Sequence, residues 1–371
     1  MTYLIIFLAL IVLRYAIGKN TIVAQQAYKP ILFFLFIFAA FRFEVGCDWG
    51  TYRMLHMLTQ QPMEDLWVRF LTEPFFILLS KLTHSLNLEH YWVNAISVAI
   101  FFCGAHAMAK RSADPLMFII LLFPILIINM PMSAVKQGAA IGFMCYAFIA
   151  FIDQKLLKFL IFVALASAFH LSALIFFILA PFVIGVMTFK KIIFGGILAL
   201  PIIGIIALSS YIDLAVNRYI QSDSVDAAGA IFRLGSLLFF STAFLLFFRN
   251  EWKKLYPSQF SLLIFGSIIA FSLLLVFPLS SVLADRFGYY LIPIFTLFLV
   301  SIPSVKNLQM RPFWVLFPYL VLIPMFIVWI SLSSHFSHCY QPYKNWLISV
   351  PDKEKYYGDI NDFEEAQLEP N

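Results

Sequence analysis

Long apolar runs recur from one end of the chain to the other, and only short charged stretches separate them. Apolar residues make up 62% of the 371 residues and charged residues only 12%, which excludes an ordinary soluble domain. Most runs approach the length that a helix needs to cross the hydrocarbon core, where a helix satisfies its own backbone hydrogen bonds. We therefore predict an all-α, polytopic membrane protein built as a helix bundle.

The apolar runs predict about twelve transmembrane helices. Their approximate spans are 2–17, 28–41, 92–109, 115–131, 136–152, 156–169, 171–187, 191–209, 232–248, 259–277, 288–304 and 313–332. The first run lacks a basic leading region and a small-residue cleavage site, so we interpret it as a retained helix rather than a signal peptide. We expect a single transmembrane domain over 1–333 and a polar C-terminal tail over 334–371.

Basic residues near helix ends orient the helices, because they are retained on the cytoplasmic side. With the N-terminus outside, one face receives fourteen of the 25 basic residues but only three of the 20 acidic residues, Asp114, Asp153 and Glu251. The other face keeps the remaining eleven basic and seventeen acidic residues. This separation of charge supports the orientation.

Two segments do not fit simple crossings. A membrane crossing at 73–86 would move every later loop, with its basic residues, to the opposite side of the membrane. We therefore predict an amphipathic or re-entrant helix there, within a periplasmic loop over 42–91. A second outer loop is expected over 210–231. The apolar stretch 156–187 holds two legs of about 15 residues, which reach roughly 23 Å against a typical 30 Å core. It predicts a short or broken helix pair with His170 at its turn.

The four cysteines are scattered and form no CxxC pair, which gives little support to metal or redox chemistry. Cys103 and Cys145 lie inside apolar runs, whereas Cys47 and Cys339 lie near charged segments. A disulfide between Cys47 and Cys339 could form if both faced an oxidising compartment. Unpaired thiols are nevertheless the favoured interpretation.

Polar side chains gather on the predicted outer face. They are Arg42, Asp48, Lys136, Gln137, His170, Arg233, Asp285, Arg286 and Tyr289, with the C-terminal stretch "SSHFSHCYQPYKNWL" on the same side. Ionisable groups at membrane depth cost roughly 2.5 to 3.5 kcal/mol on insertion scales, which indicates function. The alternative is an interfacial side chain that extends its charge into water. Function is favoured for Lys136 and Arg286, extension into water for most of the others taken singly, and His170 stays open.

Outward-facing cations suit an anion, above all a phosphate or diphosphate. Nearby carboxylates could hold those cations or act on a hydroxyl group. Aromatic side chains such as Tyr52 and Tyr289 suit sugar faces or the headgroup belt, and the belt is the favoured reading. The chain has no Gly-rich phosphate loop, no HExxH and no nucleotide fingerprint. We therefore expect a substrate that arrives already activated, with no cofactor and no metal.

Four short motifs resemble the EpsG-like and Wzy O-antigen polymerase families. "FRFEVGCDWGTY" resembles their R-x-x-x-G-x-D-x-x-x-Y opening, which an acidic position follows, here Glu73. "VKQGAAIGF" resembles an Arg-Gln helix start with Lys136 in place of Arg. "SAFHLSALI" resembles a His-x-Ser-Ala turn, and "DRFGYYL" resembles an Arg-x-x-x-Tyr element. The matches fall in chain order over roughly 42–290.

The resemblance implies a multi-pass polymerase of the bacterial inner membrane with its site on the periplasmic side. Such a glycosyltransferase joins undecaprenyl-diphosphate-linked oligosaccharide repeat units into O-antigen, capsule or exopolysaccharide, without metal or nucleotide. Its partners would be this lipid-linked oligosaccharide and the bilayer, with no nucleic acid. The acidic C-terminal tail is read as a solvated end, and docking to a chain-length regulator is the less favoured alternative.

Within this reading, Lys136, Arg286 and Arg42 bind the diphosphate and stabilise the leaving group, while Asp48 and His170 activate the acceptor or position the cations. The catalytic candidates are Asp48, Lys136, His170 and Arg286, and the substrate-binding candidates are Arg42, Tyr52, Gln137, Arg233, Asp285 and Tyr289. A flippase or secondary transporter of the same lipid-linked sugar ranks second, because no internal repeat is evident. An acyltransferase ranks third, because His170 faces away from the cytoplasm.

Overall fold

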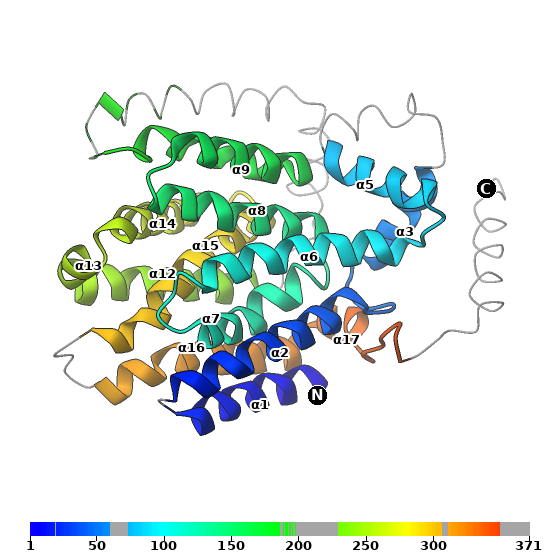
Figure 1. Ribbon diagram of the computed structural model, residues 1–371, viewed down its shortest axis with the longest axis horizontal. Helices are drawn as coiled ribbons and strands as arrows, with labels where there is room; N and C mark the ends of the chain where they lie inside the picture. Colours follow the sequence, from blue (N-terminus) through cyan, green and yellow to red (C-terminus); the bar gives the residue numbers. More distant parts are fainter. Residues whose placement is uncertain are drawn as a thin grey trace.

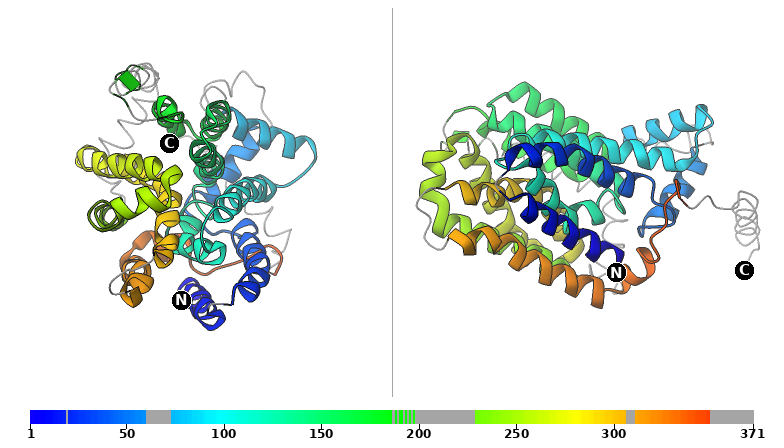
Figure 2. Two further views of the ribbon diagram at one scale, coloured as in Figure 1. Left: turned by 60° about the vertical axis from the view of Figure 1, so that its left-hand side comes forward. Right: turned by 60° about the horizontal axis from the view of Figure 1, so that its bottom comes forward.

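The computed structural model describes residues 1–18, 20–59, 73–185, 229–305 and 311–348, with single residues between 188 and 197. These residues form a bundle of roughly aligned helices (Figure 1), and the left view of Figure 2 looks more nearly along the helices. Among the described residues the only β-structure is one isolated bridge, between Arg42 and Asn345.

The elements follow one another in chain order. They are α1 (Thr2–Ile17), α2 (Thr21–Ala40), α3 (Trp49–Leu58), α5 (Pro74–Ser85), α6 (His90–Ala109), α7 (Pro115–Leu122), the π-helix η1 (Phe123–Ile127), α8 (Val135–Ile152), α9 (Leu156–Phe169), the 3-10 helix η2 (Leu171–Phe182), α12 (Ala230–Ala243), the π-helix η3 (Phe244–Phe248), α13 (Arg249–Leu255), α14 (Pro257–Val276), α15 (Ser281–Ser301), η4 (Ile302–Ser304), α16 (Arg311–Leu332) and α17 (Ser334–Cys339).

Within the described residues, seven helical segments are long and apolar enough to cross a membrane, so the chain is a polytopic helical membrane protein, as predicted. They are Ile22–Ala40, His90–Ala109, Val135–Ile152, Ala230–Leu255, Pro257–Val276, Ser281–Ser304 and Phe313–Leu332. Four shorter apolar helices coincide with further predicted spans: Thr2–Ile17, Pro115–Ile127, Leu156–Phe169 and Leu171–Phe182. The predicted span 191–209 falls mostly outside the described residues, and the total of about twelve crossings stays a prediction.

Several helices begin earlier than the apolar runs suggest, because polar residues cap them. The side chain of Asn20 accepts a hydrogen bond from the Val23 amide, so α2 begins at Thr21 and includes the exposed Lys29. Ser280 caps α15 in the same way. As a result Asp285 and Arg286 lie within a helix rather than in a loop before it.

The two ends of the bundle differ in what they carry. The N-terminus, α3, α5 and α17 lie at one end, at the right of Figure 1, and α13 lies at the opposite end. The predicted outer loop contains two helices rather than the one that was expected near 73–86. The expected helix corresponds to α5, and α3 is the additional one. We call the end with α3, α5 and α17 the α3/α5 end.

The central helices α6 and α8 pack backbone to backbone. A Cβ atom placed on Gly104 would lie 1.9 Å from the carbonyl oxygen of Gly142, and one placed on Gly142 would lie 2.5 Å from that of Ile100. Small residues allow such close approach between membrane helices. This contact fixes α8, and with it the residues of its first turn, against the rest of the bundle.

Candidate functional site

The candidate site residues lie near the helix termini of the α3/α5 end (Figure 1). Asp48 precedes α3, Lys136 and Gln137 begin α8, His170 links α9 to η2, Arg233 begins α12, and Asp285, Arg286 and Tyr289 lie in the first half of α15. The spacing of these residues in the sequence is wide, but hydrogen bonds and ion pairs join them into two groups.

The first group is built around Glu73, the residue immediately before α5. The ammonium group of Lys136 donates a hydrogen bond to Glu73 Oε2 at 2.5 Å. The His170 Nδ1 atom lies 3.0 Å from the other oxygen, Oε1. The three side chains are between 13% and 18% exposed. One half-buried carboxylate therefore connects three distant parts of the sequence.

The charge state of Glu73 determines how His170 is arranged. Burial alone would raise the pKa of Glu73, but the hydrogen bond from His170 and the charge of Lys136 outweigh it and lower this pKa to about 2. An ionised carboxylate can only accept, so the hydrogen of the imidazole sits on Nδ1. A neutral His170 then presents the lone pair of Nε2 away from Glu73.

Aromatic rings surround the Lys136 ammonium. Its nitrogen lies 4.8 Å from the centre of the Phe76 ring and 5.7 Å from the centre of the Tyr52 ring, and both rings are buried. Ring faces attract a cation within about 6 Å. Glu73 occupies one of the three hydrogens of the ammonium group, so two remain for another acceptor.

Two further bonds connect this group to α15. The side-chain amide of Gln137 donates to the carbonyl oxygen of Arg286 at 2.6 Å. The hydroxyl groups of Ser172 and Tyr290 lie 2.9 Å apart. The pKa of His170, at the turn between α9 and η2, is lowered mainly by burial, with the charge of Arg286 acting in the same direction. Arg286 is thus close enough to act on the first group.

The second group is an ion pair between α12 and α15. The guanidinium group of Arg233 donates through Nε and Nη2 to the two oxygens of Asp285, each at 2.7 Å. Both side chains are nearly buried, at 12% and 11% exposure. The guanidinium carbon also lies 5.5 Å from the centre of the buried Tyr289 ring. Because Asp285 and Arg286 are neighbours, α15 joins the two groups.

The loop before α3 packs against the segment that leads into α8. Arg42 is 1% exposed and donates to the carbonyl oxygens of Val45 at 2.9 Å and Ala39 at 3.1 Å. Burial lowers its pKa to about 10. Gly46 has a φ of +97°, and a Cβ there would lie 1.9 Å from the Met132 carbonyl oxygen. Only glycine permits this approach.

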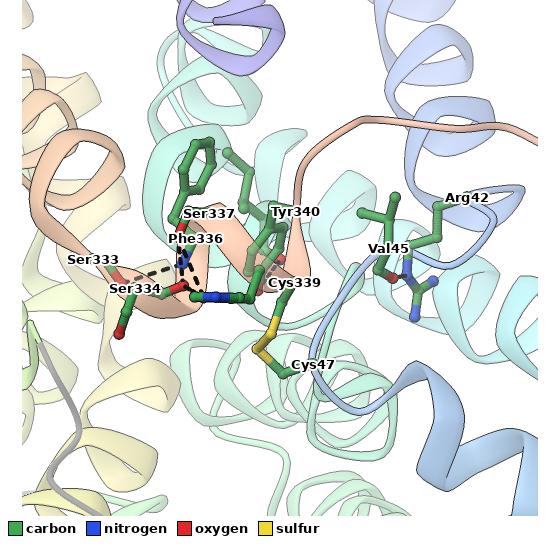
Figure 3. Close-up of a disulfide and its surroundings, with 11 residues drawn as sticks. Arg42, Val45, Cys47, Ser333, Ser334, Phe336, Ser337, Cys339 and Tyr340 are labelled. Carbon is green, nitrogen blue, oxygen red and sulfur yellow. Dashed lines mark hydrogen bonds between the residues drawn. A yellow bond between two sulfur atoms is a disulfide. The ribbon is translucent and has the colours of Figure 1, made fainter.

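A disulfide joins this loop to α17, so the preference for unpaired thiols was wrong. Cys47 and Cys339 are bonded, with Cα atoms 4.8 Å apart (Figure 3). The sequence separates them by 292 residues, and only the folding of α17 back onto the loop brings them together. Cys103 and Cys145 are free, as the favoured reading expected. Disulfides persist in oxidising compartments.

The structure thus brings most of the candidate residues together and adds others. Lys136 and His170 contact Glu73, which the resemblance marked but which was not among the predicted site residues. Tyr52 lies beside the Lys136 ammonium, and Gln137 bonds to the backbone of Arg286. Asp48 acts electrostatically on Arg42, and no ion pair joins either of them to the Glu73 group among the described residues. Glu73 was not included among the predicted site residues because it lies at the polar margin of a loop and not inside an apolar run.

A family model, that of the EpsG family, matches residues 27–345 of the chain. The chain belongs to the EpsG family. No curated protein and no solved structure matches it. The EpsG family includes Wzy-like polymerases, so membership fits a membrane-embedded polysaccharide polymerase in general.

The EpsG match covers both groups of charged residues and the segments that hold them. It begins within α2, before Arg42, and ends at Asn345, the residue bridged to Arg42. The four motifs that carried the resemblance therefore lie at one end of this EpsG-family bundle, at the loop before α3, the start of α8, the turn after α9 and the first half of α15.

Proposed function

We propose that this EpsG-family protein joins undecaprenyl-diphosphate-linked oligosaccharide repeat units at the periplasmic face of the bacterial inner membrane. The observation that carries the proposal is the Glu73 carboxylate held between Lys136 and His170 at the α3/α5 end. A carboxylate that orients an imidazole is the arrangement by which many enzymes remove a proton from a hydroxyl group.

The reaction needs a base, a leaving group and charge stabilisation. The bond between the growing glycan and its diphosphate breaks, and the same sugar carbon bonds to a hydroxyl oxygen at the non-reducing end of the new unit. The hydroxyl proton passes to His170 Nε2, and the lipid diphosphate leaves with the bonding electron pair. Lys136 and Arg286 stabilise its negative charge. No nucleotide is consumed, because the diphosphate is itself the leaving group.

We assign the remaining candidates to binding the substrate or to positioning other residues. We assign Arg233, Asp285 and Tyr289 to the substrate-binding wall next to Arg286, and Gln137 to holding the backbone of Arg286. Arg42 is too buried to meet a diphosphate directly, so we assign it and Asp48 to shaping the loop before α3.

Two observations support the periplasmic assignment. The disulfide between Cys47 and Cys339 lies at the α3/α5 end, and such bonds form in oxidising compartments. The opposite end carries the pairs of Asp114 with Arg14 and of Asp153 with Arg111, amid the excess of basic residues expected on the cytoplasmic side. A reporter that is active only in the periplasm, fused to the C-terminus, should be active. An active cytoplasmic reporter would overturn the orientation.

The decisive experiment uses purified protein and a lipid-linked repeat unit without ATP or added metal. A ladder of glycans of increasing length is expected. Transport of the lipid-linked sugar between leaflets of a vesicle, with no ladder, would instead favour the flippase. The Lys136→Ala variant should leave single repeat units in cells, and normal chain lengths would contradict its assignment.

A further inference from the structure

Residues 334–348 form a segment that folds back over the loop before α3, and we call it the strap. The Phe43 amide donates to the Lys344 carbonyl oxygen at 3.0 Å, and the Trp346 amide donates to that of Phe41 at 2.7 Å. Lys344 also pairs with Glu44 at 2.5 Å. The strap is thus paired with the loop as a short antiparallel bridge, in addition to the disulfide.

The strap is also bonded to the transmembrane helices. The Tyr343 hydroxyl donates to the Phe38 carbonyl oxygen at 2.9 Å, and the two rings stack with centres 4.4 Å apart. The Tyr3 hydroxyl donates to the Tyr340 carbonyl oxygen at 3.0 Å. The last described residues of the chain are therefore anchored to α1 and α2, the first two helices.

Tyr340 is the strap residue that reaches the segment leading into α8. It follows the disulfide-bonded Cys339 (Figure 3) and is 3% exposed. Its hydroxyl group is 3.4 Å from the Ile128 carbonyl oxygen. Burial raises the pKa of Tyr340 to about 12, and a hydrogen bond with Ser133, followed by the charges of Arg42 and Arg233, acts against this rise. The hydroxyl group thus contacts the segment that leads into α8, whose first turn holds Lys136.

We propose that the strap is a working part of the site: Tyr340 holds the segment that leads into α8, and with it Lys136, and the Cys47–Cys339 disulfide holds the strap in place. This inference rests on the proposed polymerase function and adds a requirement to it. The site is complete only when the C-terminal strap is locked onto the loop that carries Arg42 and Asp48.

Formation of the Cys47–Cys339 disulfide is a two-electron oxidation. The thiols of Cys47 and Cys339 lose two protons and two electrons as the sulfur–sulfur bond forms. The disulfide of an exchange partner, a protein thiol–disulfide oxidant of the outer compartment, takes up the electrons and becomes a dithiol. A chain kept in a reducing compartment would fold with an unlocked strap, so activity would depend on export of this end of the protein.

Two measurements on the full-length protein test the strap. The first is the glycan ladder, and the second is trypsin cleavage after Lys344, read by mass spectrometry. The Cys47→Ser/Cys339→Ser variant should lose roughly tenfold or more in ladder formation and be cut faster after Lys344 than the oxidised wild type, because release of the strap removes Tyr340 from the site. Cys103→Ser, which changes a free thiol, serves as the matched control and should match the wild type.

The Tyr340→Phe variant separates positioning from folding, because it keeps the ring and removes only the hydroxyl group. We expect the same slow cleavage after Lys344 as in the wild type, and a KM for the lipid-linked donor raised roughly tenfold with kcat changed less. An unchanged KM in Tyr340→Phe together with a normal ladder in the double serine variant would refute the role of the strap and leave the polymerase proposal standing. A wild type that makes no ladder refutes the polymerase proposal and this inference with it.

Discussion

Most ion pairs at the two ends of the helix bundle differ in exposure, apart from the partly buried Arg14–Asp114 pair opposite the site and the exposed Lys344–Glu44 pair of the strap. At the end with α13, Arg111 pairs with Asp153 and Lys254 with Glu251, and the basic partners are 47% and 73% exposed. At the α3/α5 end, the Lys136–Glu73 and Arg233–Asp285 pairs are at most 18% exposed. Solvated pairs contribute little energy, whereas half-buried charges are costly unless their partners are well placed.

Under the proposed function, the exposed pairs orient the protein in the membrane and the less exposed pairs take part in the chemistry. In the proposed orientation the exposed pairs need only remain on the cytoplasmic side, and water can replace either partner. The less exposed pairs sit at helix termini of the end that also holds the disulfide, and each of their hydrogen bonds fixes one segment against another. Equal chemical changes at the two ends should therefore have unequal effects.

The largest effect is expected for Glu73→Gln. The amide no longer carries the charge that orients Nδ1–H of His170 and balances Lys136, so the rate of glycan ladder formation should fall by about 10² to 10⁴. Single-turnover kinetics of the purified protein measure this fall. Glu251→Gln makes the same change at the other end and should leave the rate unchanged. Similar losses in both variants would remove the distinction between the two ends.

The next effect concerns stability. Arg233→Met leaves the nearly buried Asp285 without its partner, and breaking a buried ion pair typically costs about 3 to 5 kcal/mol. The thermal midpoint of the detergent-solubilised protein should fall accordingly. The double change Arg233→Met/Asp285→Leu should restore much of the loss, because two apolar side chains replace the pair. If Arg233→Met unfolds at the wild-type temperature, the pair is not a buried structural bond.

Apolar runs and basic residues predicted much of the fold. They predicted the helices and their order, because membrane helices are specified by length and hydropathy. Capping shifted some boundaries: Asn20 starts α2 seven residues before the predicted 28. The amphipathic α3 lay hidden inside the outer loop, since a ten-residue helix that does not cross the membrane leaves no long apolar run.

The candidate site was predictable in its residues but not in its connections. Lys136, His170 and Arg286 stood out because polar groups near membrane depth are unusual. Nothing in the spacing indicated that Glu73 lies between two of them, 63 and 97 positions away. The disulfide and the strap depend on a contact across 292 residues, which local sequence patterns do not encode.

A smaller effect is expected from pH. Burial lowers the pKa of His170 below its ordinary value near 6.5, so the neutral base persists at pH 7 and the rate should fall only as the pH drops below 6.5. Below the midpoint the fall is about tenfold per pH unit. The ladder rate measured between pH 4.5 and 8 tests this. Glu73 raises the pKa of His170, so in Glu73→Gln the midpoint of the pH profile of the remaining activity should move to still lower pH. A midpoint above pH 6.5 in the wild type would contradict a buried, neutral His170.

The smallest effect is expected where a solvated charge is removed. Arg111→Gln deletes an ion pair in which two guanidinium nitrogens each lie 2.9 Å from an oxygen of Asp153. The Arg233–Asp285 pair is likewise joined by two hydrogen bonds. Since Arg111 is nearly half exposed, water and Lys155 can take over at Asp153, and the loss of unfolding free energy should stay under about 1 kcal/mol and shrink further in high salt. Thermal midpoints at low and high salt measure both. A salt-independent loss as large as that of Arg233→Met would mean that burial does not distinguish the two ends.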